Sequence, residues 1–352
     1  MATHIDEQNV SDLILAAQDT LSLKIAQSRY AELRDMFDRF GVEPEKLLEY
    51  TQYELSYLAN AIAEKNPGLF TEYIDWTKSM FSSNGIALDV LEKNVGLVRA
   101  GLLAALPKET HEILSRYMQA GIAEISGALE APCSFIDPQS PHGQLAQLYL
   151  EAVLKADRGN ATRLVMESFQ AGASIQDIYI HVLQPVQYEI GRLWQTNKIT
   201  VAQEHFCSAV TQLIMSQLYY PHICSTEKKS GTMVGICVSG ELHEIGMRMV
   251  ADLFEMEGWN VCYLGANMPA YNIVDTLLEK KADMLGISAA MASCVNKAAK
   301  IIAKVRASKA AAIKIIVGGF GFNRDAGLWK LVGADSYAGS AVDVLRIARA
   351  GV

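Results

Sequence analysis

Hydrophobic residues change their spacing along the chain near residue 230, and this change separates two kinds of structure. Before it, apolar residues recur three or four positions apart in long runs such as 12–37, which predicts amphipathic helices. After it, short β-branched runs at 232–239, 260–265, 283–289 and 313–319 are each followed by a segment of helical character. Such alternation predicts a parallel, doubly wound sheet with right-handed crossovers.

The helical part of the sequence is divided by a proline-rich linker. The segment EAPCSFIDPQSPHG contains three prolines and ends in glycine, which is typical of a domain boundary. We therefore predict a multidomain protein, α followed by α/β. Its expected parts are a helical domain at 1–130, a linker at 131–143, a four-helix bundle at 144–226 and a flavodoxin-like, Rossmann-type sheet domain at 231–352.

Composition and charge narrow the function. The chain has 352 residues, 50% of them hydrophobic, which is enough for two or three cores. A net charge of -8, with no run of lysine or arginine longer than a pair, argues against direct nucleic-acid binding. The sequence shows neither an apolar run of about 20 residues nor a signal peptide, so we expect a cytoplasmic protein without membrane spans.

The cysteines favour reduced thiols in the core over disulfides or a zinc site. They show no CxxC spacing and lie scattered through apolar segments. The six are Cys133, Cys207, Cys224, Cys237, Cys262 and Cys294.

The loop after the first predicted strand carries candidate chemistry, because ligands of such sheets bind beyond the carboxyl ends of the strands. This loop reads SGELHEIGMRM and offers Glu241, His243 and Gly246, without either glycine-rich phosphate motif. A carboxylate near a neutral imidazole favours a metal ligand with its orienting partner: the carboxylate accepts one ring proton, and the other nitrogen faces the metal. A surface histidine at a helix N-terminus is the alternative that this loop alone leaves open.

Two later strand ends complete a known signature. Ser288 begins the second element in GISAAM, and Gly318 and Gly319 form the third in IIVGGF. With ELHEIG, these elements resemble the DxHxxG, SxL and GG signature of the cobalamin-binding domain shared by methionine synthase, the methylmalonyl and glutamate mutases, corrinoid methyltransferase proteins and cobalamin photoreceptors. The separations, 41 residues from Gly246 to Ser288 and 27 from Ala290 to Gly318, are similar to those of the family.

The resemblance implies a role for each of these residues. His243 would be the lower axial ligand of cobalt, while the base of cobalamin runs down a channel beside the sheet. Gly318 and Gly319 would keep the channel open, and Ser288 would hydrogen-bond the buried base. The chain departs from the signature at Glu241, where the family has aspartate, and at Ala290, where it has leucine. The longer Glu241 side chain changes the tuning of the ligand more than ligation itself.

The bundle adds a second resemblance, in LWQTNKITVAQEHF. Trp194 stands nine residues before the pair Glu204 and His205, a Wx9EH pattern similar to the cap of cobalamin-dependent photoreceptors. In those proteins the tryptophan packs over the adenosyl group, a valine placed like Val201 contacts the upper ligand, and the histidine can ligate cobalt after light. A turn at NKIT would put Val201, Glu204 and His205 on one helix face.

The resemblances imply an adenosylcobalamin light sensor rather than an enzyme. Photolysis would change the packing of the bundle and signal to a protein partner, or through self-association, by way of residues 1–130, which show no basic recognition helix. Tyr53, Tyr73 and Trp76 could line a second pocket there, or form ordinary core.

Two alternatives stay open. One is a corrinoid carrier in a methyltransferase system, which would hold methylcobalamin, and the other is a cobalamin sensor indifferent to light; hydroxocobalamin is a further form of the cofactor. A mutase is disfavoured, because the helical segment leaves no room for a substrate barrel.

Overall fold

The structure is a computed structural model that describes residues 5–127, 134–223, 230–291, 294–323 and 327–350. The chain forms two compact units: Met1–Pro132 with Gln195–Asn197, and Cys133–Trp194 with Lys198–Val352. The predicted bundle and sheet thus share the second unit. The linker residues 131–133 and the cysteines Cys133 and Cys224 lie outside the described residues.

The first unit consists of helices, and a proline and glycines mark boundaries between them. Pro67 is the first residue of its helix, and Gly41 and Gly85 adopt positive φ angles of 62° and 66° between helices. The helices are α1 (Glu7–Ala16), α2 (Gln18–Glu32), α3 (Arg34–Arg39), α4 (Pro44–Ala63), α5 (Pro67–Ser83), α6 (Leu88–Ala105) and α7 (His111–Ile125).

Aromatic residues of α4 and α5 form a surface stack on this unit. Tyr73 stacks on Tyr57 with ring centroids 4.9 Å apart, and Trp76 stacks on Tyr73 at 6.4 Å. Tyr53 is 61% exposed and Trp76 36% exposed. Of the three aromatic residues singled out in the sequence, Tyr53 and Trp76 therefore lie at the surface of the unit, whereas Tyr73 is half-buried.

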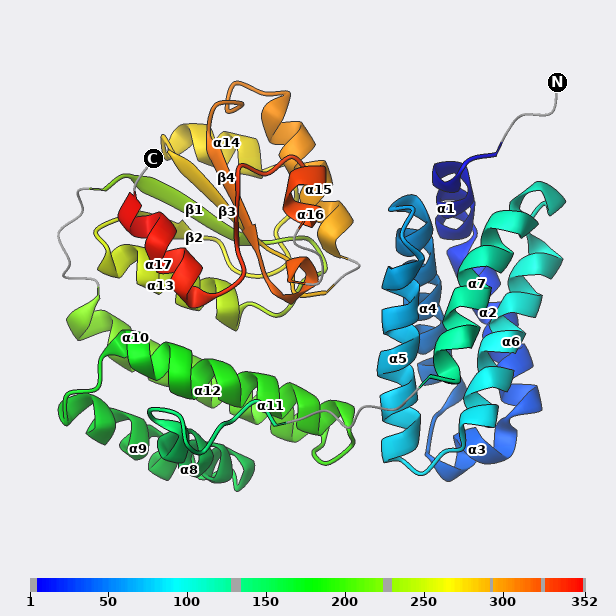
Figure 1. The fold of residues 1–352 in the computed structure, drawn as a ribbon, viewed down its shortest axis with the longest axis horizontal. Helices are drawn as coiled ribbons and strands as arrows, with labels where there is room; N and C mark the ends of the chain where they lie inside the picture. The colour runs from blue at the N-terminus through cyan, green and yellow to red at the C-terminus, as the bar shows by residue number, and fades with distance from the viewer. Residues whose placement is uncertain (1–4, 128–133, 224–229, 292–293, 324–326, 351–352) are drawn as a thin grey trace. The chain divides into compact units, whose positions relative to one another are not determined.

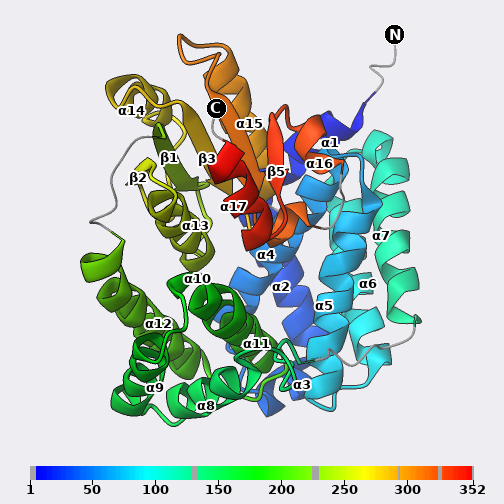
Figure 2. The same ribbon diagram turned by 60° about the vertical axis from the view of Figure 1, so that its left-hand side comes forward.

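The second unit begins with a four-helix cap (Figures 1 and 2), as predicted. The cap comprises α8 (Gly143–Leu154), α9 (Arg158–Gln170), α10 (Ile175–Ile178), the π-turn η2 (Tyr179–Leu183), α11 (Gln184–Gln195) and α12 (Val201–His222). The short helix α10 continues through the π-turn into α11, and Thr200 caps α12 by exchanging hydrogen bonds with Gln203.

A parallel sheet with the strand order β2-β1-β3-β4-β5 completes the second unit, and this is the flavodoxin order. Its strands are β1 (Thr232–Cys237), β2 (Asn260–Tyr263), β3 (Met284–Ser288), β4 (Lys314–Gly318) and β5 (Ser336–Ala338). The first four were predicted. The fifth was not, because its three residues, SYA, show no β-branched run.

Helices cover both faces of the sheet (Figure 1). One face packs against α14 (Ile273–Glu279), α15 (Val295–Arg306) and α16 (Leu328–Leu331), and the other against α13 (Ile245–Met256) and α17 (Ala341–Ala350). On the α13 face, Gly235 of β1 lies beside Gly286 of β3, which lies beside Ile316 of β4. Two neighbouring glycines leave the middle of that face without side chains of its own, so a space opens between sheet and helices.

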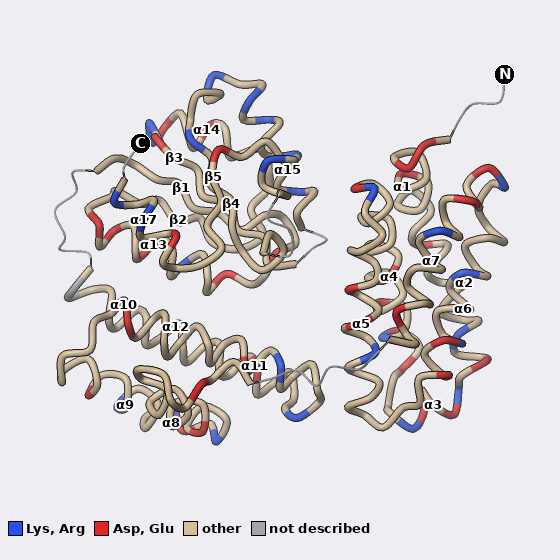
Figure 3. The backbone as a smooth tube through the Cα atoms, in the orientation of Figure 1, with Lys and Arg blue, Asp and Glu red and all other residues tan. Residues whose placement is uncertain are grey.

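Surface charge and cysteine chemistry fit the sequence. Acidic and basic residues intermix along the helices of the first unit, while α12 is sparsely charged (Figure 3).

The described cysteines are free thiols, and burial raises the pKa of Cys207 to about 11 and that of Cys237 to about 12. Among the described residues, no helix combines the length and apolar character needed to cross a bilayer.

Candidate functional site

Glu241 is the anchor of the loop that follows β1. Its side chain is 0% exposed, yet both carboxylate oxygens are fully engaged. Oε1 accepts from the backbone N–H of His243 at 3.0 Å and pairs with His243 Nδ1 at 2.6 Å. Oε2 accepts from the backbone N–H groups of Ala290 and Met291 at 2.8 and 3.0 Å. One carboxylate therefore orients the imidazole and ties this loop to the loop after β3.

The electrostatics of the pair follow from these contacts. Burial alone would raise the pKa of Glu241, but hydrogen bonds from the His243 ring and from the amides of His243 and Met291 outweigh it and lower the pKa to about 2. The hydrogen bond to Glu241 raises the pKa of His243 against the opposing effect of burial. The carboxylate is thus an anion throughout the physiological range.

The imidazole of His243 is presented outward, with 66% of its side chain exposed. Because Nδ1 is directed at the carboxylate, the neutral ring carries its proton there and keeps the lone pair on Nε2. That arrangement fits a single nitrogen ligand to a transition metal. His243 does lie at the surface, two residues before α13, but the buried carboxylate fixes the orientation of its ring.

A second loop supports the first. Gly240, at φ +76°, donates its N–H to Asn267 Oδ1 at 2.7 Å, and the Asn267 N–H donates to the Glu241 carbonyl at 3.0 Å. Asn267 itself has a positive φ of 55°, which asparagine tolerates better than most residues. These two hydrogen bonds hold the loops together. The sequence analysis gave Asn267 no role; the place of this residue in a loop after the second predicted strand was the available signal.

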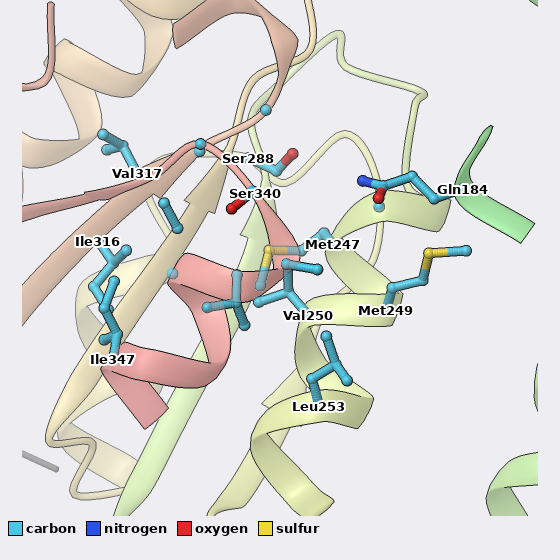
Figure 4. A pocket seen from close by; sticks show the side chains of 18 of the residues that line it. Gln184, Met247, Met249, Val250, Leu253, Ser288, Ile316, Val317, Ser340 and Ile347 are labelled. Carbon is cyan, nitrogen blue, oxygen red and sulfur yellow. The ribbon is translucent and has the colours of Figure 1, made fainter. Parts of the chain in front are cut away.

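A pocket of about 120 Å³, partly open to solvent, lies between the sheet and the helices α13 and α17 (Figure 4). Ser288, Gly318 and Gly319 line it at the carboxyl ends of β3 and β4, and Gly246 lines it from α13. The cap contributes Tyr179, Ile180, Gln184 and Tyr188 to the same pocket. The structure therefore brings the second and third elements of the signature together around one cavity.

Gly318 and Gly319 are needed for the backbone as well as for the cavity. A Cβ on Gly318 would lie 2.8 Å from the Ala338 carbonyl oxygen, and one on Gly319 would lie 2.6 Å from the Ala289 carbonyl oxygen. Gly319 also has a φ of +98°, which side chains rarely adopt. The sequence attributed these glycines to the open channel alone, and the close approach of neighbouring strand ends is a second reason for them.

The residues predicted on the cap lie at the end of α11 and the start of α12. Trp194 is 42% exposed and Val201 51% exposed. Glu204 accepts a hydrogen bond from Ser208 at 2.8 Å, and its charge adds to the raised pKa of His243. His205 is exposed, with Nδ1 3.9 Å from Glu204 Oε2. The structure therefore places Glu204 within electrostatic reach of His243.

Polar contacts join the cap to α13. Gln212 donates to Glu244 Oε1 at 3.1 Å, and Arg248 donates to Ser216 Oγ at 2.7 Å. Tyr219 donates to Glu255 Oε2 at 2.9 Å. Met249 of α13 also packs into the apolar core of the cap. The sequence did not identify this junction, because its partners lie on helix faces whose pairing depends on the tertiary fold.

Asp252 makes this junction sensitive to pH. Tyr179 donates its hydroxyl proton to Asp252 Oδ2 at 2.7 Å. Burial raises the pKa of Asp252 to about 6, with Glu255 adding to the rise and both Tyr179 and Arg248 opposing it. Because the folded pKa exceeds the unfolded value, the neutral acid is the form that folding favours, so its stabilisation is present at low pH and lost as pH rises through about 6.

We expect the Asp252→Asn variant to lose this pH dependence. Relative to the variant, the wild type should gain about 1 kcal/mol of unfolding free energy when the pH falls from 7.5 to 5.0. Urea titrations of both proteins at the two pH values measure the difference. If the difference in unfolding free energy between wild type and variant were the same at both pH values, the raised pKa of Asp252 would be contradicted.

Comparisons with known proteins identify B12 binding domains in the chain. Residues 231–348 match a family model described as a B12 binding domain, and residues 145–219 match a second model of the same description. Over 125 residues the chain is 30% identical to dimethylamine corrinoid protein 3 of Methanosarcina acetivorans, covering 35% of this chain and 57% of that relative's length. Over 203 residues it is 27% identical to trimethylamine corrinoid protein 1 of Methanosarcina mazei, covering 55% and 91%.

The fold is similar to a solved corrinoid protein. The structure of the Methanosarcina barkeri monomethylamine corrinoid protein aligns with a TM-score of 0.53 and 19% identity, covering 60% of this chain and 99% of that one. These comparisons do not show the resemblance to photoreceptors that residues 194–205 suggested. Residues 145–219 and 231–348 are therefore B12 binding domains, arranged as in the cobalamin-binding proteins in which a helical cap precedes a Rossmann-like sheet domain.

Proposed function

We propose that this protein is a corrinoid carrier, which holds cobalamin through His243 and presents a methyl group to partner proteins of a methyl-transfer system. The observation that carries the proposal is the outward imidazole of His243, which the buried Glu241 fixes in the loop after β1. The chain resembles proteins named as dimethylamine and trimethylamine corrinoid proteins, which supports a carrier over a light sensor or a light-independent cobalamin sensor.

Each residue of the site has a task in this proposal. Cobalamin, when bound, supplies a cobalt centre that can accept and donate a methyl group. His243 Nε2 would bind the cobalt, and the Glu241 carboxylate would set the direction of the imidazole and raise its basicity. Ser288, Gly318 and Gly319 line the space for the nucleotide tail. The partner would approach from the side opposite His243.

The junction between the cap and α13 is suited to opening for such a partner. Exposed or half-exposed polar pairs such as Gln212 with Glu244 and Arg248 with Ser216 can exchange their hydrogen bonds for water at about 0.5–1.5 kcal/mol each. A carrier needs its upper face uncovered for methyl transfer and covered between transfers. Residues 1–130 are the candidate surface for a protein partner or for self-association.

A light sensor is the second candidate, and the cap residues favour it. Trp194, Val201, Glu204 and His205 match the photoreceptor pattern, and Glu204 acts electrostatically on His243. In that function, an adenosyl group would pack against Trp194, and His205 would hold the cap in its lit arrangement. The two candidates therefore differ in the upper ligand that the cap prefers.

Ligation by His243 is tested with the His243→Ala variant. We expect the absorbance spectrum of histidine-coordinated cobalamin to disappear and the affinity for methylcobalamin to fall by about tenfold or more, because the axial nitrogen is lost. The exposed His205 provides the control, since His205→Ala should leave dark binding of methylcobalamin unchanged. Uptake of cobalamin by His243→Ala with the wild-type spectrum would overturn the site.

Affinities for methylcobalamin and adenosylcobalamin, measured in the dark, separate the two candidates. A carrier should bind methylcobalamin at least as tightly as adenosylcobalamin, and Trp194→Ala should not change the ratio. A light sensor should prefer adenosylcobalamin by about tenfold or more, lose that preference in Trp194→Ala, and change its spectrum irreversibly under green light. Preference for neither form, without a light response, would indicate a light-independent cobalamin sensor.

A further inference from the structure

Two methionine side chains occupy the inner end of the pocket. Gly235 and Gly286 lie side by side in β1 and β3, and the space above them is filled by Met247 from α13 and Met233 from β1. A Cβ on Gly235 would lie 2.7 Å from the Met247 methyl carbon, and one on Gly286 would lie 3.2 Å from it. Because neither glycine has a side chain, the methyl ends of the two methionines can lie against this part of the sheet, and a larger residue at either glycine position would clash with them.

The chemistry of the pocket differs between its two ends. Ser288 and Ser340 line the end near the carboxyl ends of β3 and β5, whereas Leu253, Ile316 and Ile347 line the pocket together with Met247 (Figure 4). Met233, Met247 and Ile316 also belong to the apolar cluster that α13 and α17 bury against the sheet. The side chains of Met233, Met247, Leu253, Ile316 and Ile347 carry no hydrogen-bond donor, so they offer an apolar wall to a group that lies against them.

We propose that Met247, together with Met233, forms a movable inner wall that selects the base of the cofactor's nucleotide tail, favouring an apolar bicyclic base of the benzimidazole type over an amino-purine. This inference rests on the proposed placement of cobalamin on His243. Methionine has no branch at Cβ, so it can turn aside to admit a flat ring, and its sulfur then contacts the ring favourably. The amino group of adenine would be buried there without a partner.

Three corrinoids test the inference on the full-length protein without any measure of activity. They are cobalamin, the analogue whose base is adenine, and cobinamide, the same corrin without a nucleotide. Absorbance titrations should show that wild type binds cobalamin about tenfold or more tightly than the adenine analogue. Equal affinity for the two would overturn the proposal. Cobinamide reports on His243 alone, so its failure to bind would count against the placement on His243, not against selection by Met247.

Variants of Met247 give the decisive comparison. Met247→Phe puts a stiff ring where the base should enter, so the advantage of cobalamin over cobinamide should vanish while cobinamide binding stays the same. Met284→Leu is the matched control, because Met284 lies on the same face of the sheet but outside the pocket lining, and it should change neither affinity. A full cobalamin advantage in Met247→Phe would overturn the proposal.

The Met247→Ala variant tests the same role of Met247 if the Met247→Phe variant does not fold. Shortening the side chain leaves room for adenine with a water molecule on its amino group, so the preference for cobalamin over the adenine analogue should fall by about threefold or more. An unchanged preference in this variant would equally overturn the role of Met247.

Discussion

Replacing Glu241 by alanine should lower the affinity for cobalamin by about 10–100-fold and destabilise the sheet domain by about 3 kcal/mol or more. The carboxylate is fully buried and accepts hydrogen bonds from the His243 ring and from three backbone amides. Alanine would leave the amides of His243, Ala290 and Met291 without an acceptor and would free the imidazole to rotate. Absorbance titration with cobalamin and urea unfolding measure the two effects.

Conservative variants separate orientation from charge. Glu241→Asp keeps the anion and is the residue that the cobalamin-binding signature has at this position, so it should retain most of the affinity. Glu241→Gln keeps the length but turns an amide N–H₂ toward backbone N–H donors, so it should behave like alanine. Glu279→Ala, on an exposed carboxylate, is the control and should change neither property. Wild-type binding by Glu241→Ala would remove the carboxylate from the site.

The elements that the sequence predicted well are those with a strong local pattern. The four longer strands, the cap helices and the flavodoxin-like arrangement follow from β-branched runs, helical periodicity and alternation, and the structure confirms them. The pairing of Glu241 with His243 was also predictable, because two residues of separation in a tight loop bring the side chains together.

The rest of the site depends on backbone contacts and strand register, which the identities of single residues do not reveal. The Ala290 and Met291 amides reach Glu241 through their backbone, so their side chains gave no signal. Gly235 and Gly286 each look like an ordinary strand glycine, and only the register of β1 against β3 shows that they are neighbours. Long-range register of this kind is set by the whole sheet rather than by local sequence.

The cap shows a further limit of sequence reasoning. The Wx9EH pattern led to a light sensor, whereas the comparisons support a corrinoid carrier better. Trp194 and His205 are compatible with either function, since exposed aromatic and imidazole groups can pack against an upper ligand or lie beside a transfer route. A short motif does not distinguish a light sensor from a corrinoid carrier, because both kinds of protein contain such a bundle.

Replacing Gly319 by alanine should destabilise the sheet domain by about 2 kcal/mol or more and weaken cobalamin binding with it. A methyl group at this position would stand 2.6 Å from the carbonyl oxygen of Ala289 and 2.8 Å from its carbonyl carbon, and backbone atoms cannot turn aside as a side chain can. The φ of +98° adds strain for any residue with a Cβ. Relief would require the loops after β3 and β4 to move apart, and the loop after β3 is the one that Glu241 holds.

Gly246 supplies the matched control, because it belongs to the same signature and lines the same pocket. A Cβ there meets no atom within 4 Å, and the residue is in the first turn of α13 with an ordinary helical conformation. Gly246→Ala should therefore leave the unfolding free energy unchanged or raise it by about 0.5–1 kcal/mol, as alanine does in helices. If Gly319→Ala were as stable as Gly246→Ala, the close approach of the β3 and β4 loops would not be what requires glycine at position 319.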